Sequence, residues 1–99
     1  MKIIETQRYK VQLRDITLNI KKDKPQSSVK FAQDLKEQIS NIPNMPKKYR
    51  KSEYYEDENI RDMIFRGYTI IYELYENIIE IQTIFNQNLP LLKKEQNPL

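Results

Sequence analysis

The chain has 99 residues, of which 38% are apolar and 31% charged, and its formal net charge is +3. This length suffices for one domain with a single modest core. The absence of Cys and His excludes disulfides, thiolate metal sites and the commonest transition-metal ligand. No apolar run approaches the roughly 20 residues that span a bilayer, and the first residues lack the apolar stretch of a signal peptide. We therefore expect a cytoplasmic protein without a metal or cofactor.

The first half of the chain predicts one strand and two helices. The strand is the segment KIIE, directly after Met1. Apolar side chains then recur at helical spacing, at Tyr9, Leu13, Ile16 and Ile20. The segment KKDKP ends this helix, and its proline, Pro25, suits the first turn of the next one. A link this short predicts an antiparallel helix hairpin.

The second helix has its own apolar stripe. The stripe comprises Val29, Ala32, Leu35, Ile39 and Ile42, with Phe31 beside it. Pro43 and Pro46 are expected to end the helix, because proline cannot continue the backbone hydrogen-bond pattern.

The second half predicts three strands, at 60–65, 68–75 and 78–85. Gly67 lies between the first two, where a turn requires a positive φ or a bulge is present, and Glu76-Asn77 is a credible two-residue turn. Strict alternation in the last strand places Ile79, Ile81, Thr83 and Phe85 on one side and Ile78, Glu80, Gln82 and Ile84 on the other. The predicted fold class is α+β: an N-terminal strand, an antiparallel helix hairpin, then a three-stranded antiparallel meander, with the helices on one sheet face. We expect a single domain over 1–88 and a tail, 89–99, that is mobile or held by a partner.

Two runs of opposite charge precede the first meander strand. The segment MPKKYRK places four cations around Tyr49: Lys47, Lys48, Arg50 and Lys51. The segment EYYEDE follows, with its acids around Tyr54 and Tyr55. A basic run around an aromatic ring suits phosphate binding. The alternative, which the general weakness of short motifs favours, is a solvated loop whose charges pair with one another.

The order of these elements resembles the RelE/ParE toxin superfamily of bacterial type II toxin–antitoxin modules, known also from plasmid stabilisation systems. The resemblance covers residues 1–88 and is carried by KDKPQSSVKFAQDLKEQISNIPNMP and NIRDMIFRGYTIIYELYENIIEIQTIF. The matching positions are Pro25, Pro43, Arg61, Gly67, Tyr68, Tyr72, Glu80 and Ile81. No single motif is specific, and the order and spacing carry the resemblance. It implies a toxin that arrests bacterial growth until a cognate antitoxin binds it.

Two activities compete within this superfamily. RelE-like members cut mRNA at the ribosome, and ParE-like members poison DNA gyrase. The nuclease branch uses an Arg in the last strand and a His or Tyr just after it, where this chain has Thr83 and Asn86. Neither residue carries a cation or shuttles a proton at neutral pH. Enzymatic activity is therefore uncertain, and the resemblance favours the gyrase branch.

Three alternatives remain open at this point: an mRNA endonuclease, an eroded non-toxic relative that only binds its partner, and a general RNA-binding domain. The last is weaker, because a net charge of +3 is little for unaided affinity to nucleic acid. RNA cleavage requires a proton acceptor, a proton donor and cations at the phosphorane. Arg61 and Arg66 are the candidate catalytic cations, and Tyr54, Tyr55 and Tyr72 are candidate proton donors. The structural alternatives are a core position for Tyr72 and a pairing of Arg61 with Asp62 or Glu80.

The resemblance also implies two contact surfaces. The predicted target-binding residues, for gyrase or for ribosome-bound mRNA, are Lys47, Lys48, Arg50, Lys51, Arg61 and Arg66. The antitoxin is expected to fold on binding, in the groove between the hairpin and the sheet or at the chain end. Its predicted contacts are Leu13, Ile20, Phe31, Leu89, Leu91 and Leu92. A homodimer or a hetero-oligomer with the antitoxin is compatible with both surfaces.

Overall fold

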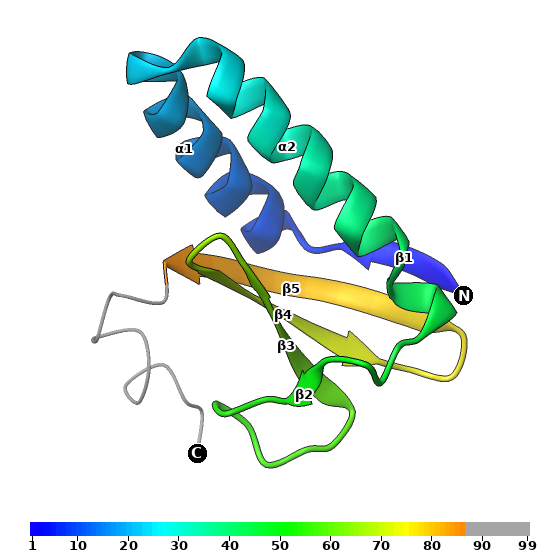
Figure 1. The fold of residues 1–99 in the computed structure, drawn as a ribbon. Coiled ribbons are helices and arrows are strands. Elements are labelled where there is room, and N and C mark those ends of the chain that lie inside the picture. Colours follow the sequence, from blue (N-terminus) through cyan, green and yellow to red (C-terminus); the bar gives the residue numbers. More distant parts are fainter. Residues whose placement is uncertain (87–99) are drawn as a thin grey trace.

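The computed structural model describes residues 1–86 of the chain as a helix hairpin on a five-stranded sheet (Figure 1). The elements are β1 (Lys2–Glu5), α1 (Gln7–Asp23), α2 (Pro25–Ser40), the 3₁₀ turn η1 (Ile42–Asn44), β2 (Arg50–Lys51), β3 (Ile60–Phe65), β4 (Tyr68–Leu74) and β5 (Ile78–Asn86). The strand order is β1-β5-β4-β3-β2, with β1 parallel to β5 and the other pairs antiparallel. The α+β class and the meander of β3, β4 and β5 are confirmed. Strand β2 was not predicted, since its two residues are too few for a periodic signal.

The helix boundaries follow from local capping. Thr6 begins α1, and its hydroxyl accepts a hydrogen bond from the Tyr9 N–H at 3.1 Å. The chain turns at Lys24, and Pro25 is the first residue of α2, as predicted. The Ser28 hydroxyl donates to the Thr17 carbonyl at 2.7 Å, which ties the two helices together near the turn. The predicted antiparallel hairpin is confirmed.

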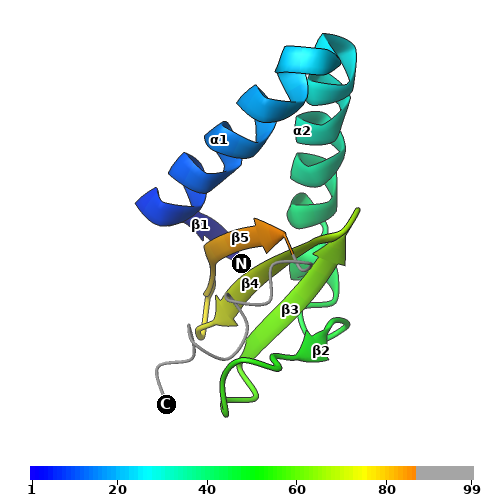
Figure 2. The same ribbon diagram turned by 90° about the vertical axis from the view of Figure 1, so that its left-hand side faces the viewer.

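The hairpin meets the sheet at one end and projects beyond it at the other. Figure 2 shows α1 and α2 side by side at the tip and splayed apart where they reach the sheet. Leu13, Ile16 and Ile20 are accordingly only half-buried. The prediction for Val29 is wrong, because this side chain is 58% exposed. Ser28 takes the inward place, and the buried stripe of α2 runs through Ser28, Phe31, Leu35 and Ile39.

The main core lies between the hairpin and one face of the sheet, called here the helix-covered face. The helical side contributes Tyr9, Phe31, Leu35 and Ile39, followed by Ile42 of η1. The sheet contributes Met63, Phe65, Ile70, Tyr72, Leu74, Ile79, Ile81 and Ile84. The Phe31 ring meets the Phe65 and Tyr68 rings edge-on, at 5.2 and 5.5 Å between centroids. Ile70, Tyr72 and Leu74 are therefore the residues by which β4 contributes to the main core.

A bulge in β5 changes which side chains reach this core. Ile71 pairs with Thr83, but the next residue, Tyr72, pairs with Ile81, so Gln82 is an extra residue in the ladder. The predicted strict alternation is therefore wrong beyond Ile81. Ile84 joins the main core, whereas Phe85 packs in a second cluster with Tyr54, Ile60 and Ile71. A count with period two cannot detect such an insertion.

The two hairpin turns of the meander follow the predicted chemistry. Phe65 and Tyr68 are paired across Arg66 and Gly67, whose φ angles are 49° and 84°. Two successive residues with positive φ are typical of a type I′ turn, so Gly67 serves a turn and not a bulge. Across Glu76-Asn77, the Tyr75 N–H donates to the Ile78 carbonyl at 2.8 Å. This confirms the second predicted two-residue turn.

Candidate functional site

The backbone of the basic loop, residues 45–51, is held by two buried polar side chains from β3 and β4. Arg61 is 7% exposed, and its Nη1 donates to the Tyr49 carbonyl at 3.0 Å and the Lys47 carbonyl at 3.4 Å. Its Nε donates to the Glu58 carbonyl at 2.8 Å. The Tyr72 hydroxyl donates to the Pro46 carbonyl at 2.8 Å. The sheet therefore fixes the backbone of the basic loop.

The fixed backbone directs the charged side chains of this loop outward. Lys47, Lys48 and Lys51 are exposed, and Met45 beside them is 64% exposed. The Lys48 ammonium lies 5.6 Å from the centre of the Tyr49 ring, which itself meets the Tyr72 ring edge-on. A surface whose backbone is already ordered loses less conformational entropy when a partner binds. The basic loop is therefore a preorganised cationic surface.

The two candidate catalytic arginines lie at opposite ends of β3. Arg61 is turned inward and bonds carbonyl oxygens, which agrees with the structural alternative, although its partners are not the predicted acids. Arg66 is exposed in the β3–β4 turn, forms an ion pair with Asp34 of α2, and lies over the Phe65 ring. Five residue-to-residue steps along an extended strand separate the two arginines by roughly 16 Å. The structure does not bring them together as one site.

The candidate proton donors are also placed by the fold. Tyr72 is completely buried, and burial raises its pKa well above the usual range. Tyr54 is buried in the second cluster, where burial and then the nearby Asp62 charge raise its pKa. A raised pKa favours the protonated phenol. Tyr55 is half-buried and lines a cavity described below.

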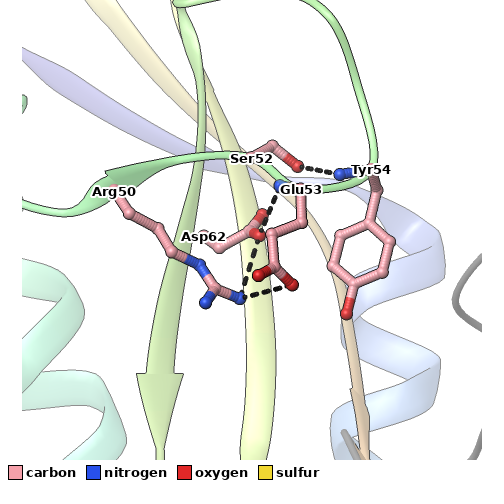
Figure 3. A network of polar contacts seen from close by, with 5 residues as sticks. All are labelled: Arg50, Ser52, Glu53, Tyr54 and Asp62. Atoms are coloured by element: carbon pink, nitrogen blue, oxygen red, sulfur yellow. Dashed lines mark hydrogen bonds and ion pairs between the residues drawn. The ribbon is translucent and has the colours of Figure 1, made fainter.

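A network of polar groups fixes the start of the acidic loop, residues 52–59 (Figure 3). Asp62 is 1% exposed, and its Oδ2 accepts from the Glu53 N–H at 3.0 Å and from Arg50 Nη2 at 3.3 Å. Arg50 also contacts Glu53 at 3.3 Å, and the Tyr54 N–H donates to the Ser52 hydroxyl at 3.1 Å. Burial raises the Asp62 pKa, against the opposing effects of the Glu53 N–H and Arg50.

The acidic loop partly covers the sheet face opposite the helices, called here the open face. The Tyr54 ring meets the Phe85 ring edge-on at 5.4 Å between centroids and packs on Ile60 and Ile71. Strands β3, β4 and β5 bring three carboxylates to this face, those of Asp62, Glu73 and Glu80. These three strands bring no Lys or Arg to it. The Gln82 amide donates to Glu73 at 2.9 Å and to Glu80 at 3.0 Å.

A cavity of about 200 Å³ opens on this face beside β5. It is lined by Arg8, Gln12, Tyr54, Tyr55, Ile71, Thr83 and Phe85. Gln12 Oε1 accepts from the Thr83 hydroxyl at 2.8 Å and from the Ile84 N–H at 2.9 Å. The Thr6 hydroxyl donates to the Gln82 carbonyl at 2.8 Å. Side chains of the α1 region thus cover the edge of β5 where β1 has ended.

Arg8 and Gln12 were not selected as site residues from the sequence. Both flank the apolar stripe of α1 and look like ordinary surface positions. Their separation of four residues places them on one helix side, which is the signal that sequence reasoning had available. The spacing of Arg8 and Gln12 indicates a site only when the edge of β5 is known to lie beside them.

The predicted antitoxin contacts differ in how accessible they are. Phe31 is buried in the core, and Leu13 and Ile20 are half-buried against it. Other apolar side chains of the hairpin are more exposed, namely Val11, Leu18 and Val29. Leu89, Leu91 and Leu92 lie outside the described residues. The hairpin therefore exposes apolar side chains, but these are not the residues predicted to contact the antitoxin.

No cluster of acidic side chains in residues 1–86 has the arrangement of a metal site. No helix in the same part of the chain is both long and apolar enough to cross a membrane.

The family model described as the ParE toxin of the type II toxin–antitoxin system parDE matches residues 3–88. A solved structure described as the chromosomal ParDE TA system from P. aeruginosa superposes with a TM-score of 0.74 at 19% sequence identity, covering 87% of this chain and 95% of that one. At that identity the likeness establishes a shared fold. Curated protein sequences gave no match. Because the family model covers most of its length, the chain belongs to the ParE toxin family of type II toxin–antitoxin systems.

Proposed function

We propose that this toxin arrests bacterial growth by poisoning DNA gyrase and that a cognate antitoxin neutralises it. The observation that supports this branch over mRNA cleavage is the chemistry of the open face. Strands β3, β4 and β5 bring Asp62, Glu73 and Glu80 to that face and no cation. The positions expected to hold an Arg and a His or Tyr carry Thr83 and Asn86.

Phosphorane chemistry does not suit this arrangement. Cleavage by 2′-OH attack adds negative charge at phosphorus, and preorganised cations must stabilise it. The half-buried carboxylates of Glu73 and Glu80 on the same face repel an RNA backbone instead. The Thr83 hydroxyl is already engaged with Gln12, and Arg61 bonds the backbone of the basic loop. Poisoning an enzyme requires a binding surface but no proton transfer, so the missing groups are no obstacle to it.

The basic loop is the surface that we assign to the target. Its outward cations, Lys47, Lys48 and Lys51, fit an anionic partner such as gyrase engaged with DNA. Arg50 contributes less, because it is paired with Asp62 and Glu53. Arg61 and Tyr72 act as positioning residues, since they hold the backbone that carries these cations.

Growth and DNA damage test this proposal in cells. Induced expression of the chain should arrest growth and induce the SOS response, without codon-position cuts in mRNA. The double variant Lys47→Glu/Lys48→Glu should relieve the arrest because it reverses the charge of the basic loop. Lys21→Glu/Lys22→Glu, which makes the same charge change at the distal end of α1, should leave the arrest intact.

Three outcomes would contradict parts of the proposal. Ribosomal A-site cuts without SOS induction would establish the nuclease branch. Arrest by a folded Lys47→Glu/Lys48→Glu protein equal to that of the wild type would remove the basic loop from the target surface. Normal growth despite abundant folded toxin would favour the non-toxic binding relative.

The antitoxin contact that we propose is the exposed apolar side of the hairpin. Val11 and Leu18 are seven residues apart on α1 and lie on one stripe, where an amphipathic segment of the antitoxin can pack. Hydrogen exchange should therefore show added protection in α1 when the antitoxin binds. Leu18→Asp should weaken the complex, whereas Ile64→Asp, at an exposed apolar position on β3, should not. Protection confined to residues 47–58 would show that this placement is wrong.

A further inference from the structure

The cavity on the open face lies beside the last described strand, and the chain continues from there. Phe85 lines the cavity, and the described part of the chain ends one residue later, at Asn86. The following sequence, QNLPLLKKEQNPL, holds three leucines and then two lysines. We propose that Leu89, Leu91 and Leu92 dock at this cavity, so that the toxin covers part of its own open face. This inference is independent of the target and goes beyond the proposed function.

The cavity has the size for one aliphatic side chain, and its wall is apolar on one part and formed by Arg8, Gln12 and Thr83 on the other. Its volume is about 200 Å³, and four of its lining side chains are apolar or aromatic: Tyr54, Tyr55, Ile71 and Phe85. A cavity of roughly 150 Å³ with apolar walls accommodates a molecule of benzene. A leucine side chain is smaller than a benzene molecule, so one leucine side chain fits a cavity of this volume. Entry of a leucine side chain would also bury the half-exposed Phe85 ring.

The length of the chain end permits this docking. An extended chain covers at most ~3.3–3.6 Å per residue, so Leu89 reaches roughly 10 Å from Asn86 and Leu92 roughly 20 Å. The cavity begins at the residue adjacent to Asn86, well within that reach. A segment tethered this closely has an effective concentration on the order of millimolar, which a free partner must exceed.

Charge complementarity supports the same occupant and its direction. Lys93 and Lys94 follow Leu92 directly. The acidic loop, which supplies Tyr54 and Tyr55 to the cavity wall, carries four exposed acids: Glu53, Glu56, Asp57 and Glu58. Leucines in the cavity would bring the two lysines towards this loop. An acidic partner segment would instead be repelled by the acids of this loop.

The test is methyl NMR on the full-length toxin with labelled leucines. We expect nuclear Overhauser effects between methyl groups of Leu89, Leu91 or Leu92 and ring protons of Tyr55 or Phe85, with ring-current shifts of those methyls. The variant Leu89→Ser/Leu91→Ser/Leu92→Ser should abolish the contacts, and Lys93→Glu/Lys94→Glu should weaken them. Leu18→Ser, at an exposed leucine of the hairpin, should leave them unchanged.

The same spectra identify the results that would overturn the proposal. Methyl shifts of all three leucines at random-coil values, with no contact to either ring, would contradict it. Contacts that arise only after antitoxin is added would also contradict it, because the free toxin would then not cover its own cavity. The amide spectrum of residues 1–86 establishes the folding of each variant.

Discussion

The helix-covered face and the open face are built from alternate residues of the same strands, yet they carry opposite chemistry. On β4, Ile70 belongs to the core under the hairpin, and its neighbour Ile71 lines the cavity on the other side. The covered face is almost continuously apolar, whereas the open face combines carboxylates, a few rings and a cavity. The helix-covered face therefore provides most of the stability, and the open face is less completely buried.

The largest expected effect is a difference in stability between variants of Ile70 and Ile71. Ile70→Ala should lower the free energy of unfolding by about 4 kcal/mol, because the emptied space is enclosed on all sides. Ile71→Ala should cost only about 2 kcal/mol, since it enlarges an existing opening. Urea denaturation of both purified proteins measures the difference. Equal losses would show that the open face is as tightly packed as the covered one.

The two arginines provide the next contrast. Arg61→Ala leaves the carbonyls of Lys47, Tyr49 and Glu58 without their side-chain donor and empties a buried position, and should cost about 2–3 kcal/mol. Arg66→Asn removes an exposed charge but keeps a residue that tolerates positive φ, and should unfold close to the wild type.

The same denaturation series measures both variants. The Arg61 variant should also loosen the basic loop, which hydrogen exchange at residues 47–49 would detect. A stable Arg61→Ala protein with an unchanged loop would contradict the positioning role and return Arg61 to the candidates for target binding.

The smallest expected effect concerns pH. Burial raises the Asp62 pKa in the folded state, and in the unfolded chain the pKa of an Asp is ~3.9. Between these two values the folded protein binds more protons, so the contribution of Asp62 to stability falls as pH rises through that window. Asp62→Asn cannot ionise and should remove this slope. Urea midpoints of both proteins across the acid range test it, and identical slopes would contradict the assignment.

The sequence predicted most of the fold because its signals are local. The proline at the start of α2, the bounds of β3 and the turn at Gly67 each follow from the chemistry of a few neighbouring residues. The errors arise where the deciding contact is distant in sequence. The bulge at Gln82 depends on pairing with β4. Ser28, and not the predicted Val29, faces inward on α2, where it bonds to α1.

The candidate site was less predictable for the same reason. The run of lysines identified the basic loop, but the burial of Arg61 beneath it requires knowledge of how β2 and β3 pair. Arg8 and Gln12 line the cavity only because β1 is shorter than β5 and leaves an edge for α1 to cover. Such relations between elements are not encoded in the spacing of any single segment.

The central claim is that this toxin acts by binding gyrase through the basic loop and not by RNA chemistry on the open face, and a reconstituted gyrase assay tests it most directly. Purified toxin should inhibit supercoiling by DNA gyrase and trap cleaved DNA on the enzyme in a dose-dependent manner, and pre-formed antitoxin complex should not. In a parallel reaction with programmed ribosomes, the same toxin should leave the mRNA intact. Unaffected gyrase together with cleaved ribosome-bound mRNA would contradict the account.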